Sequence, residues 1–231
     1  MEQIGVIIVA GGIGSRMGGS KPKQFLFLDG EPILSRTINN FANALPAAEI
    51  VVVLPKEYMS FWHDLAARFE VSRHTVVAGG EERFYSVKNG LAALSPETEL
   101  IAVQDGVRPL GTSELIVRTA IAAATYGAAI PVVEPVDSFR LTDGSQSQVI
   151  DRHRLRMVQT PQIFEARLLR KAYETEFSPV FTDDASVVEH AGSPIFLCEG
   201  EHRNLKITTP EDLLFAEALL ANEQTTDGDN L

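Results

Sequence analysis

Short apolar runs alternate with longer segments of helical periodicity along most of the chain. Five segments that contain short apolar runs are expected as strands, near 4–10, 49–55, 74–78, 99–104 and 128–134, and the run Val6–Ala10 is typical of a buried parallel strand. Shorter strands are expected near 194–199 and 204–208. Helical patterns separate or follow these strands at 32–44, 56–69, 82–94, 112–126, 165–176, 184–191 and 210–222. This order predicts an α/β fold with a doubly wound, mostly parallel sheet flanked by helices.

Residues 135–160 interrupt the alternation. The segments 137–141 and 148–152 flank an Asp143-Gly144 pair, which is a turn signal of β-hairpins. A hairpin that projects from an α/β body exposes strand edges, and such edges need to be covered. We therefore expect a protruding β-hairpin arm at about 135–160.

The end of the chain contains the clearest helix start. Thr209 is placed as the N-cap, Pro210 takes the first helical position, and Asp212 follows three residues after the cap. A chain of 231 residues is long enough for one sizeable domain, which we place at 1–221. Residues 222–231 are polar and acidic, and we expect them to be disordered.

Composition excludes several classes of protein. Hydrophobic content is 45%, yet no apolar run approaches the roughly 20 residues that span a membrane, and no leader pattern is evident at the start. Cys198 is the single cysteine, which rules out an internal disulfide and suits a cytoplasmic location. The formal net charge of −11 argues against nucleic acid or an anionic membrane as partners.

One segment of the chain is positively charged, in contrast to the negative charge of the whole. Between Ala10 and Leu28 the chain has three cations and no carboxylate, and five glycines follow the first apolar run. Glycine allows backbone N–H groups to approach a phosphate closely, because no Cβ intervenes. The segment therefore predicts a site for a polyphosphate.

Neither of the two common phosphate motifs fits this segment. Gly14 and Gly19 have the P-loop spacing, but Ser20 occupies the position that requires lysine. Gly12 and Gly14 begin a dinucleotide motif, but Met17 replaces its third glycine. What remains is a long basic loop that wraps over a nucleoside triphosphate.

That loop resembles the signature of nucleotidyltransferases with a Rossmann-like domain, with a glycine-rich turn, Arg-Met and then Pro-Lys-Gln. The segment 79–86 resembles the cytosine-binding segment of cytidylyltransferases. The segment 104–109 is similar to their His-Asp-x-x-Arg-Pro element, with glutamine in the histidine position. Four further segments complete the series in the family's order, at 151–152, 159–162, 182–186 and 204–208. Over residues 4–221 the chain resembles the 2-C-methyl-D-erythritol 4-phosphate cytidylyltransferase family.

The resemblance implies transfer of CMP from CTP to a polyol phosphate, with release of pyrophosphate. The nucleophile is then a substrate phosphate oxygen that is already ionised at pH 7, so no protein base is required. The implied catalytic residues are Arg16, Lys23, Arg152 and Lys206. The implied nucleotide contacts are Ala10, Gly11, Gly12, Gly14, Gly80, Ser86 and Asp105. The implied substrate contacts are Asp105, Arg108, Ser138, Arg152, Thr160 and Lys206.

The resemblance also implies a cofactor and a partner. Magnesium is expected, held mainly by the triphosphate with Asp105 nearby, because Mg²⁺ gives up its waters reluctantly. In the family the arm interlocks with a second subunit and carries substrate residues into its site. We therefore expect a homodimer in which Arg152 and Thr160 bind the acceptor phosphate across the interface.

Simpler interpretations stand beside these. Ser86 could bond its own backbone, Asp105 and Arg108 could form a structural turn pair, and Lys206 could merely protect a strand edge. Residues 182–184 could act only as a helix start. Ser138 stands where the family usually has threonine. At the level of function, the alternatives are a ribitol-5-phosphate cytidylyltransferase and a non-catalytic nucleotide-sensing module.

Overall fold

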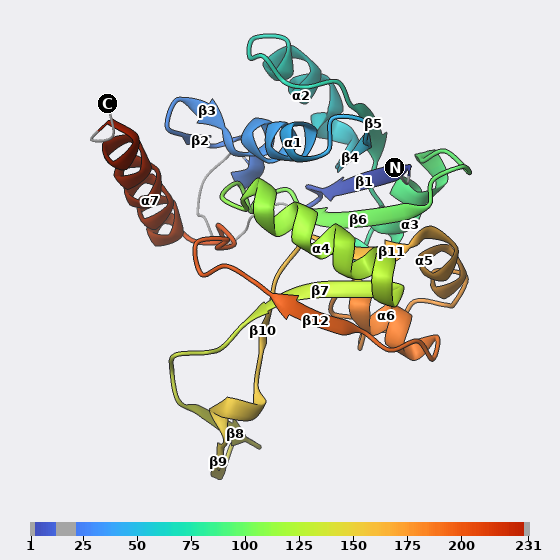
Figure 1. Cartoon of the computed structure of the whole chain (residues 1–231), viewed down its shortest axis with the longest axis vertical. Coiled ribbons are helices and arrows are strands. Elements are labelled where there is room, and N and C mark those ends of the chain that lie inside the picture. Colours follow the sequence, from blue (N-terminus) through green and yellow to red (C-terminus); the bar gives the residue numbers. More distant parts are fainter. Residues whose placement is uncertain (1–2, 13–21, 229–231) are drawn as a thin grey trace.

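The central sheet is the frame of the molecule (Figure 1). The structure is a computed structural model, and it describes residues 3–12 and 22–228. The strands lie in the spatial order β5 (Thr75–Ala78), β4 (Glu49–Leu54), β1 (Ile4–Val9), β6 (Leu100–Asp105), β11 (Gln162–Glu165) and β7 (Ala128–Val133). Two further strands pair with β7, namely β10 (Met157–Val158) and β12 (Phe196–Glu199). The prediction of a mostly parallel sheet is confirmed, although β10 and β11 run antiparallel to their neighbours.

Helices cover both faces of this sheet, which explains why the central strands β1 and β4 are apolar over most of their length. Val6 and Ile8 of β1 face one core, while Ile7 between them faces the other. The first core is closed by α1 (Ile33–Ala44), α2 (Met59–Ala66) and α4 (Ser113–Tyr126). The second core is closed by α3 (Arg83–Ala93), α5 (Ala166–Ala172) and α6 (Asp184–His190).

A third, smaller core lies under the last helix, α7 (Pro210–Gly228). It includes Leu28 from the short hairpin of β2 (Phe27–Leu28) and β3 (Glu31–Pro32). The predicted helix start is confirmed, because the Asp212 N–H donates to the Thr209 hydroxyl at 3.3 Å and the Thr209 N–H donates to the Asp212 carboxylate at 2.8 Å. The helix runs to Gly228, beyond the expected end at 222, while residues 229–231 lie outside the described part.

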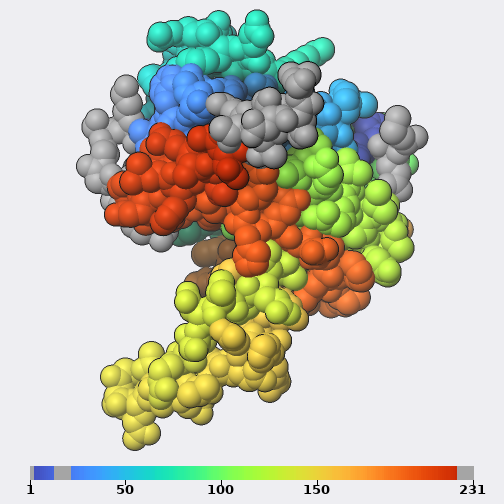
Figure 2. Space-filling view, turned by 60° about the vertical axis from the view of Figure 1, so that its left-hand side comes forward, coloured from blue at the N-terminus to red at the C-terminus, as the bar shows by residue number. Residues whose placement is uncertain are grey.

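The predicted arm is present as a hairpin of β8 (Phe139–Thr142) and β9 (Ser147–Ile150). Its turn is stabilised by the Asp143 carboxylate, which accepts from the backbone N–H groups of Ser145 and Gln146. Figure 2 shows the arm, in yellow, standing away from the body. Apolar side chains on or beside it are left uncovered, and Val136 and Val149 are each 73% exposed.

Several element predictions were wrong. No strand forms at 204–208, a fully described segment in which the Ile207 N–H donates to the Val107 carbonyl at 2.9 Å without a ladder around it. The helix expected at 56–69 is divided into the 3₁₀ turn η3 (Lys56–Tyr58) and α2. The strand β11, which is inserted between β6 and β7, was not expected.

The described part of the chain also bears on membranes and on cysteine chemistry. Within it, no helix combines the length and the apolar content needed to cross a bilayer. Cys198 is buried in β12, with its sulfur 3.7 Å from the Thr119 hydroxyl. Burial raises the pKa of this thiol, which favours a packed rather than a reactive cysteine.

Gly127 ends α4 in the left-handed region, with φ of +84°. Its substitution by alanine should lower the free energy of unfolding by about 1–2 kcal/mol, through backbone strain alone, because a Cβ there meets nothing closer than 4.0 Å. Urea unfolding measures the loss. Gly127→Asn is the matched control and should lose less, since asparagine tolerates this conformation. Equal losses for the two variants would contradict the explanation.

Candidate active site

The carboxyl ends of the parallel strands meet at a cavity of about 440 Å³. In doubly wound sheets this edge is where ligands bind. The cavity is lined by Val9, Ala10, Gly11, Gly12, Lys23, Gln24, Gly80, Glu81, Glu82, Arg83, Ser86, Asp105, Val107 and Lys206. The expected convergence of the glycine loop, the 79–86 segment and Asp105 on one edge is therefore confirmed for the described residues.

The ends of the glycine loop are held together by a buried side chain. Gln24 donates from Nε2 to the Ala10 carbonyl at 2.7 Å, which joins the two sides of the loop at its base. The next residue, Phe25, is buried and lies against Trp62, with ring centroids 6.0 Å apart. These contacts fix η2 (Lys23–Phe25) and so place Lys23 at the cavity wall. Gly14 and Arg16 lie outside the described residues.

Gly80 and Ser86 form a fixed corner at the start of α3. The Gly80 N–H donates to the Ser86 hydroxyl at 3.2 Å. A Cβ at Gly80 would come within 2.4 Å of the Tyr85 Cβ, so only glycine fits. Because a hydroxyl can donate while it accepts, Ser86 retains a proton for a ligand. The partner of the hydroxyl is therefore the backbone of Gly80 and not that of Ser86's own helical turn, and Ser86 lies at the cavity.

Asp105, the last residue of β6, lies among three cations. Its carboxylate is 3.0 Å from Lys206 Nζ, 3.3 Å from Arg108 Nε and 3.9 Å from Arg83 Nε. Burial alone would raise the pKa of Asp105, but Lys206, Arg83 and Arg108 lower it from the usual 3.8 to about 2. The carboxylate is therefore ionised at neutral pH and offsets part of the positive charge.

The loop that carries Lys206 is fixed by its neighbours. Arg108 donates from Nη1 to the Asn204 carbonyl at 2.7 Å, and Asn204, which is fully buried, donates to the Thr160 carbonyl at 2.8 Å. The Thr160 hydroxyl accepts from the Asp105 N–H at 3.1 Å. Lys206 itself remains 43% exposed at the cavity.

These features agree with comparisons to known proteins. The chain matches the family described as 2-C-methyl-D-erythritol 4-phosphate cytidylyltransferase over residues 4–222. A relative of that name from Bacteroides fragilis is 47% identical over 216 residues, covering 93% of this chain and 98% of the relative. The chain belongs to the 2-C-methyl-D-erythritol 4-phosphate cytidylyltransferase family.

Solved structures support this membership. A structure described as 4-diphosphocytidyl-2C-methyl-D-erythritol synthase, from Anaerococcus prevotii, superimposes with a TM-score of 0.81 at 29% identity, over 95% of this chain and 99% of that one. The 2-C-methyl-D-erythritol 4-phosphate cytidylyltransferase from Thermus thermophilus gives a TM-score of 0.74 at 34% identity, over 95% and 98%.

The structure divides the predicted site residues into two groups. Among the described residues, Ala10, Gly11, Gly12, Lys23 and Lys206 line the cavity as expected. Gly80, Ser86 and Asp105 also line it, whereas Arg108 and Thr160 are engaged with the backbone or carboxylate groups around Asp105. Thr160 is buried beside Asp105 of its own chain, so the expectation that it acts across the subunit interface is wrong. A role for Arg108 and Thr160 toward substrate stays a prediction.

The two arm residues lie apart from this cavity within one chain. Ser138 is exposed, and Arg152 donates from Nη1 to the Val136 carbonyl at the base of the arm. Neither lines the 440 Å³ cavity. The arm points away from the body in both views (Figures 1 and 2).

Sequence patterns missed one part of the site, the pair formed by Arg83 and Asp184. Asp183, the residue before, is the N-cap of α6, as the helix-start interpretation of 182–184 expects. Asp184 instead is fully buried and receives two hydrogen bonds from Arg83, at 3.0 and 2.6 Å. The feature of the sequence that could have indicated this pair is the second carboxylate, Asp184, directly after the capping residue Asp183.

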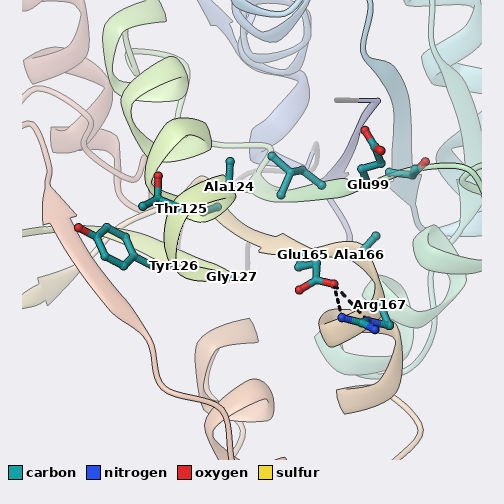
Figure 3. Close-up of a pocket in the computed structure, with 11 residues that line it drawn as sticks. Glu99, Ala124, Thr125, Tyr126, Gly127, Glu165, Ala166 and Arg167 are labelled. Atoms are coloured by element: carbon teal, nitrogen blue, oxygen red, sulfur yellow. Dashed lines mark hydrogen bonds and ion pairs between the residues drawn. The ribbon is translucent and has the colours of Figure 1, made fainter. Parts of the chain in front are cut away.

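Another cavity, of about 690 Å³, opens at the opposite end of the sheet (Figure 3). It lies between the end of α4 and the start of α5, and the labelled residues include Glu99, Tyr126, Glu165 and Arg167. Its arginine pairs with Glu165 at 3.0 Å and is well exposed. The 440 Å³ cavity instead has three cations, Lys23, Arg83 and Lys206, at the edge where doubly wound sheets bind ligands, so it is the better candidate for a polyphosphate.

The low pKa of Asp105 leads to a stability prediction. A depressed pKa stabilises the folded state fully above about pH 4, and that stabilisation is lost as the pH falls from about 4 toward 2. The free energy of unfolding of the wild type minus that of Asp105→Asn should therefore shrink by about 2 kcal/mol between pH 5 and pH 2. Urea unfolding at a series of pH values measures it. Asp64→Asn, at an exposed carboxylate, is the control for losing one carboxyl group. A difference that stays constant down to pH 2 would contradict the ion cluster.

Proposed function

We propose that the protein transfers CMP from CTP to the phosphate of 2-C-methyl-D-erythritol 4-phosphate, giving the CDP-alcohol and pyrophosphate. The observation that carries this proposal is the cationic cluster around Asp105 at the glycine-lined edge, in a chain of this family. An oxygen of the substrate phosphate forms a bond to the α-phosphorus of CTP. The bond from that phosphorus to the α,β-bridging oxygen breaks, and the electron pair leaves with pyrophosphate.

The residues of the cavity suit this displacement because it needs positioning and charge neutralisation rather than a base. Lys23 and Lys206 line the cavity from opposite parts of the chain, and both are assigned to the transferring phosphate and the leaving group. Arg16, in the glycine loop, is assigned the same role. The backbone of Gly11, Gly12 and Gly80 approaches the nucleotide without steric hindrance.

Magnesium fits the donor set of this cavity. Within residues 3–12 and 22–228, no three His, Cys, Asp or Glu side chains gather as a metal site, and the carboxylates that line the cavity are those of Asp105, Glu81 and Glu82. One or two protein carboxylates are enough for Mg²⁺ when a triphosphate supplies most of its other ligands. Bound there, the ion neutralises charge on the phosphates. Lys206, Arg83 and Arg108 keep the Asp105 carboxylate ionised, and so able to accept the ion.

We further propose that the enzyme is a cytoplasmic homodimer with shared sites. The arm exposes apolar side chains, including Val136 and Val149, and its unpaired strand edges need a partner. Arg152 and Ser138 lie on or beside the arm, away from their own cavity. An arm that docks on a second copy would bring both residues to the acceptor at the partner's site.

The assay that tests the activity is pyrophosphate release with CTP and Mg²⁺. We expect turnover with 2-C-methyl-D-erythritol 4-phosphate and at most slow release with ribitol 5-phosphate.

Lys206→Ala should reduce kcat by about 10²–10³-fold, as for loss of a donor to a developing charge, whereas Lys171→Ala, at an exposed position of α5, should not. Preference for ribitol 5-phosphate would overturn the acceptor. CTP binding without turnover on either acceptor would favour the sensing module.

The shared site predicts complementation between inactive subunits. Arg152→Ala and Lys23→Ala proteins should each be nearly inactive, and mixing them should restore part of the activity, because each heterodimer contains one intact composite site. Activity is measured after subunit exchange has been verified by mass spectrometry of the native complexes. No recovery in exchanged heterodimers would show that Arg152 serves its own chain.

A further inference from the structure

Arg83 connects the cavity to a buried carboxylate that the reaction does not use. Its Nη1 and Nη2 atoms donate to the two oxygens of Asp184 at 3.0 and 2.6 Å, and its Nε lies 3.9 Å from Asp105. A bidentate pair of this kind fixes the plane of the guanidinium as well as its position. Arg83 is also part of the cavity wall.

Asp184 is itself held in place by burial and by hydrogen bonds. It has no solvent exposure, and the Tyr173 hydroxyl donates to its Oδ1 atom at 2.6 Å. Tyr173 is buried and stacks on Phe84, with ring centroids 4.7 Å apart. A buried carboxylate is stable only when it is paired and hydrogen-bonded, and this one receives three donors. Asp184 therefore acts as a rigid support for Arg83.

The three residues join separate elements at one wall of the cavity. Arg83 opens α3 directly after the 79–82 segment, Tyr173 follows α5, and Asp184 opens α6. The link is long in sequence, since Arg83 and Asp184 are 101 residues apart. Movement of α6 away from the sheet would therefore remove the partner that holds Arg83 at the start of α3.

We propose that Arg83 is a positioning residue whose bidentate grip by Asp184, supported by Tyr173, holds the 79–86 segment against Asp105 in the geometry that binds the nucleotide. This role rests on the proposed use of CTP, and it concerns binding of the nucleotide rather than of the acceptor. Burial acts to lower the pKa of Arg83, but Asp184 and Asp105 raise it overall, so the guanidinium stays charged.

A matched control lies at the other end of α3, the helix that Arg83 begins. Arg170 of α5 donates to the carbonyls of Leu91, Leu94 and Ser95 at 2.7, 3.3 and 3.0 Å, where α3 ends. Arg170→Lys thus loosens α3 by removing a comparable set of arginine bonds, far from the cavity. It separates loss of stability from loss of nucleotide position.

The experiment measures the Kd of CTP with Mg²⁺ by calorimetry, without acceptor, and then KM and kcat in the pyrophosphate assay. Asp184→Asn should weaken CTP binding by about tenfold or more, and Tyr173→Phe by a smaller factor. KM for the acceptor should remain within about twofold of the wild type in both variants. Arg170→Lys should lower the melting temperature yet leave the Kd of CTP unchanged.

Two results would overturn the proposal. One is an unchanged Kd of CTP in folded Tyr173→Phe and Asp184→Asn proteins, and the other is an equal loss of affinity in Arg170→Lys. If Asp184→Asn does not fold, Arg83→Lys replaces it, because lysine keeps the charge but cannot form the bidentate pair. Since the CTP titration needs no acceptor, it decides the role of Arg83 even where the acceptor assay fails.

Discussion

The ion cluster at the end of β6 is the interaction on which the architecture of this protein depends. Asp105 is almost entirely buried, and a buried carboxylate without partners would be strongly destabilising. Its three cations come from the start of α3, from the turn after β6 and from the loop before α7. Each of these segments is positioned by a different part of the sheet. Assembly of the cluster therefore requires that the strands, the 79–86 segment and the 204–206 loop be in place together.

The same cluster explains why an acidic protein can accept a polyanion. The chain has a net charge of −11, yet the cluster places three cations around a single carboxylate at this edge of the sheet. Lys206 is the most exposed of the three cations, so it can turn toward a ligand while Arg83 and Arg108 continue to offset Asp105. Removal of the carboxylate would leave three like charges in close contact.

Much of this arrangement follows from local patterns. Continuous apolar runs such as 50–54 and 100–103 identify the parallel strands, because helices on both faces leave no polar side. The rule that ligands bind at strand carboxyl ends is enough to place Gly11 and Asp105 at one edge, since each follows a recognisable strand. By contrast, the pairing of Arg83 with Asp184 and of Asn204 with Thr160 joins residues far apart in sequence. Neither periodicity nor spacing carries information about such partners. The lack of a strand at 204–208 has the same origin, since its alternating pattern is satisfied by side-chain contacts instead of a ladder.

The two ends of the arm leave and re-enter the body side by side. Val133, the last residue of β7, pairs directly with Met157 of β10, so the intervening hairpin is an insertion between adjacent antiparallel strands. An insertion of this kind can lengthen, shorten or change sequence without altering the order of the sheet, because its ends remain joined by the same ladder. Natural variation in the arm is therefore decoupled from folding of the catalytic body. A change confined to the arm therefore leaves the cavity at the carboxyl ends of the strands intact.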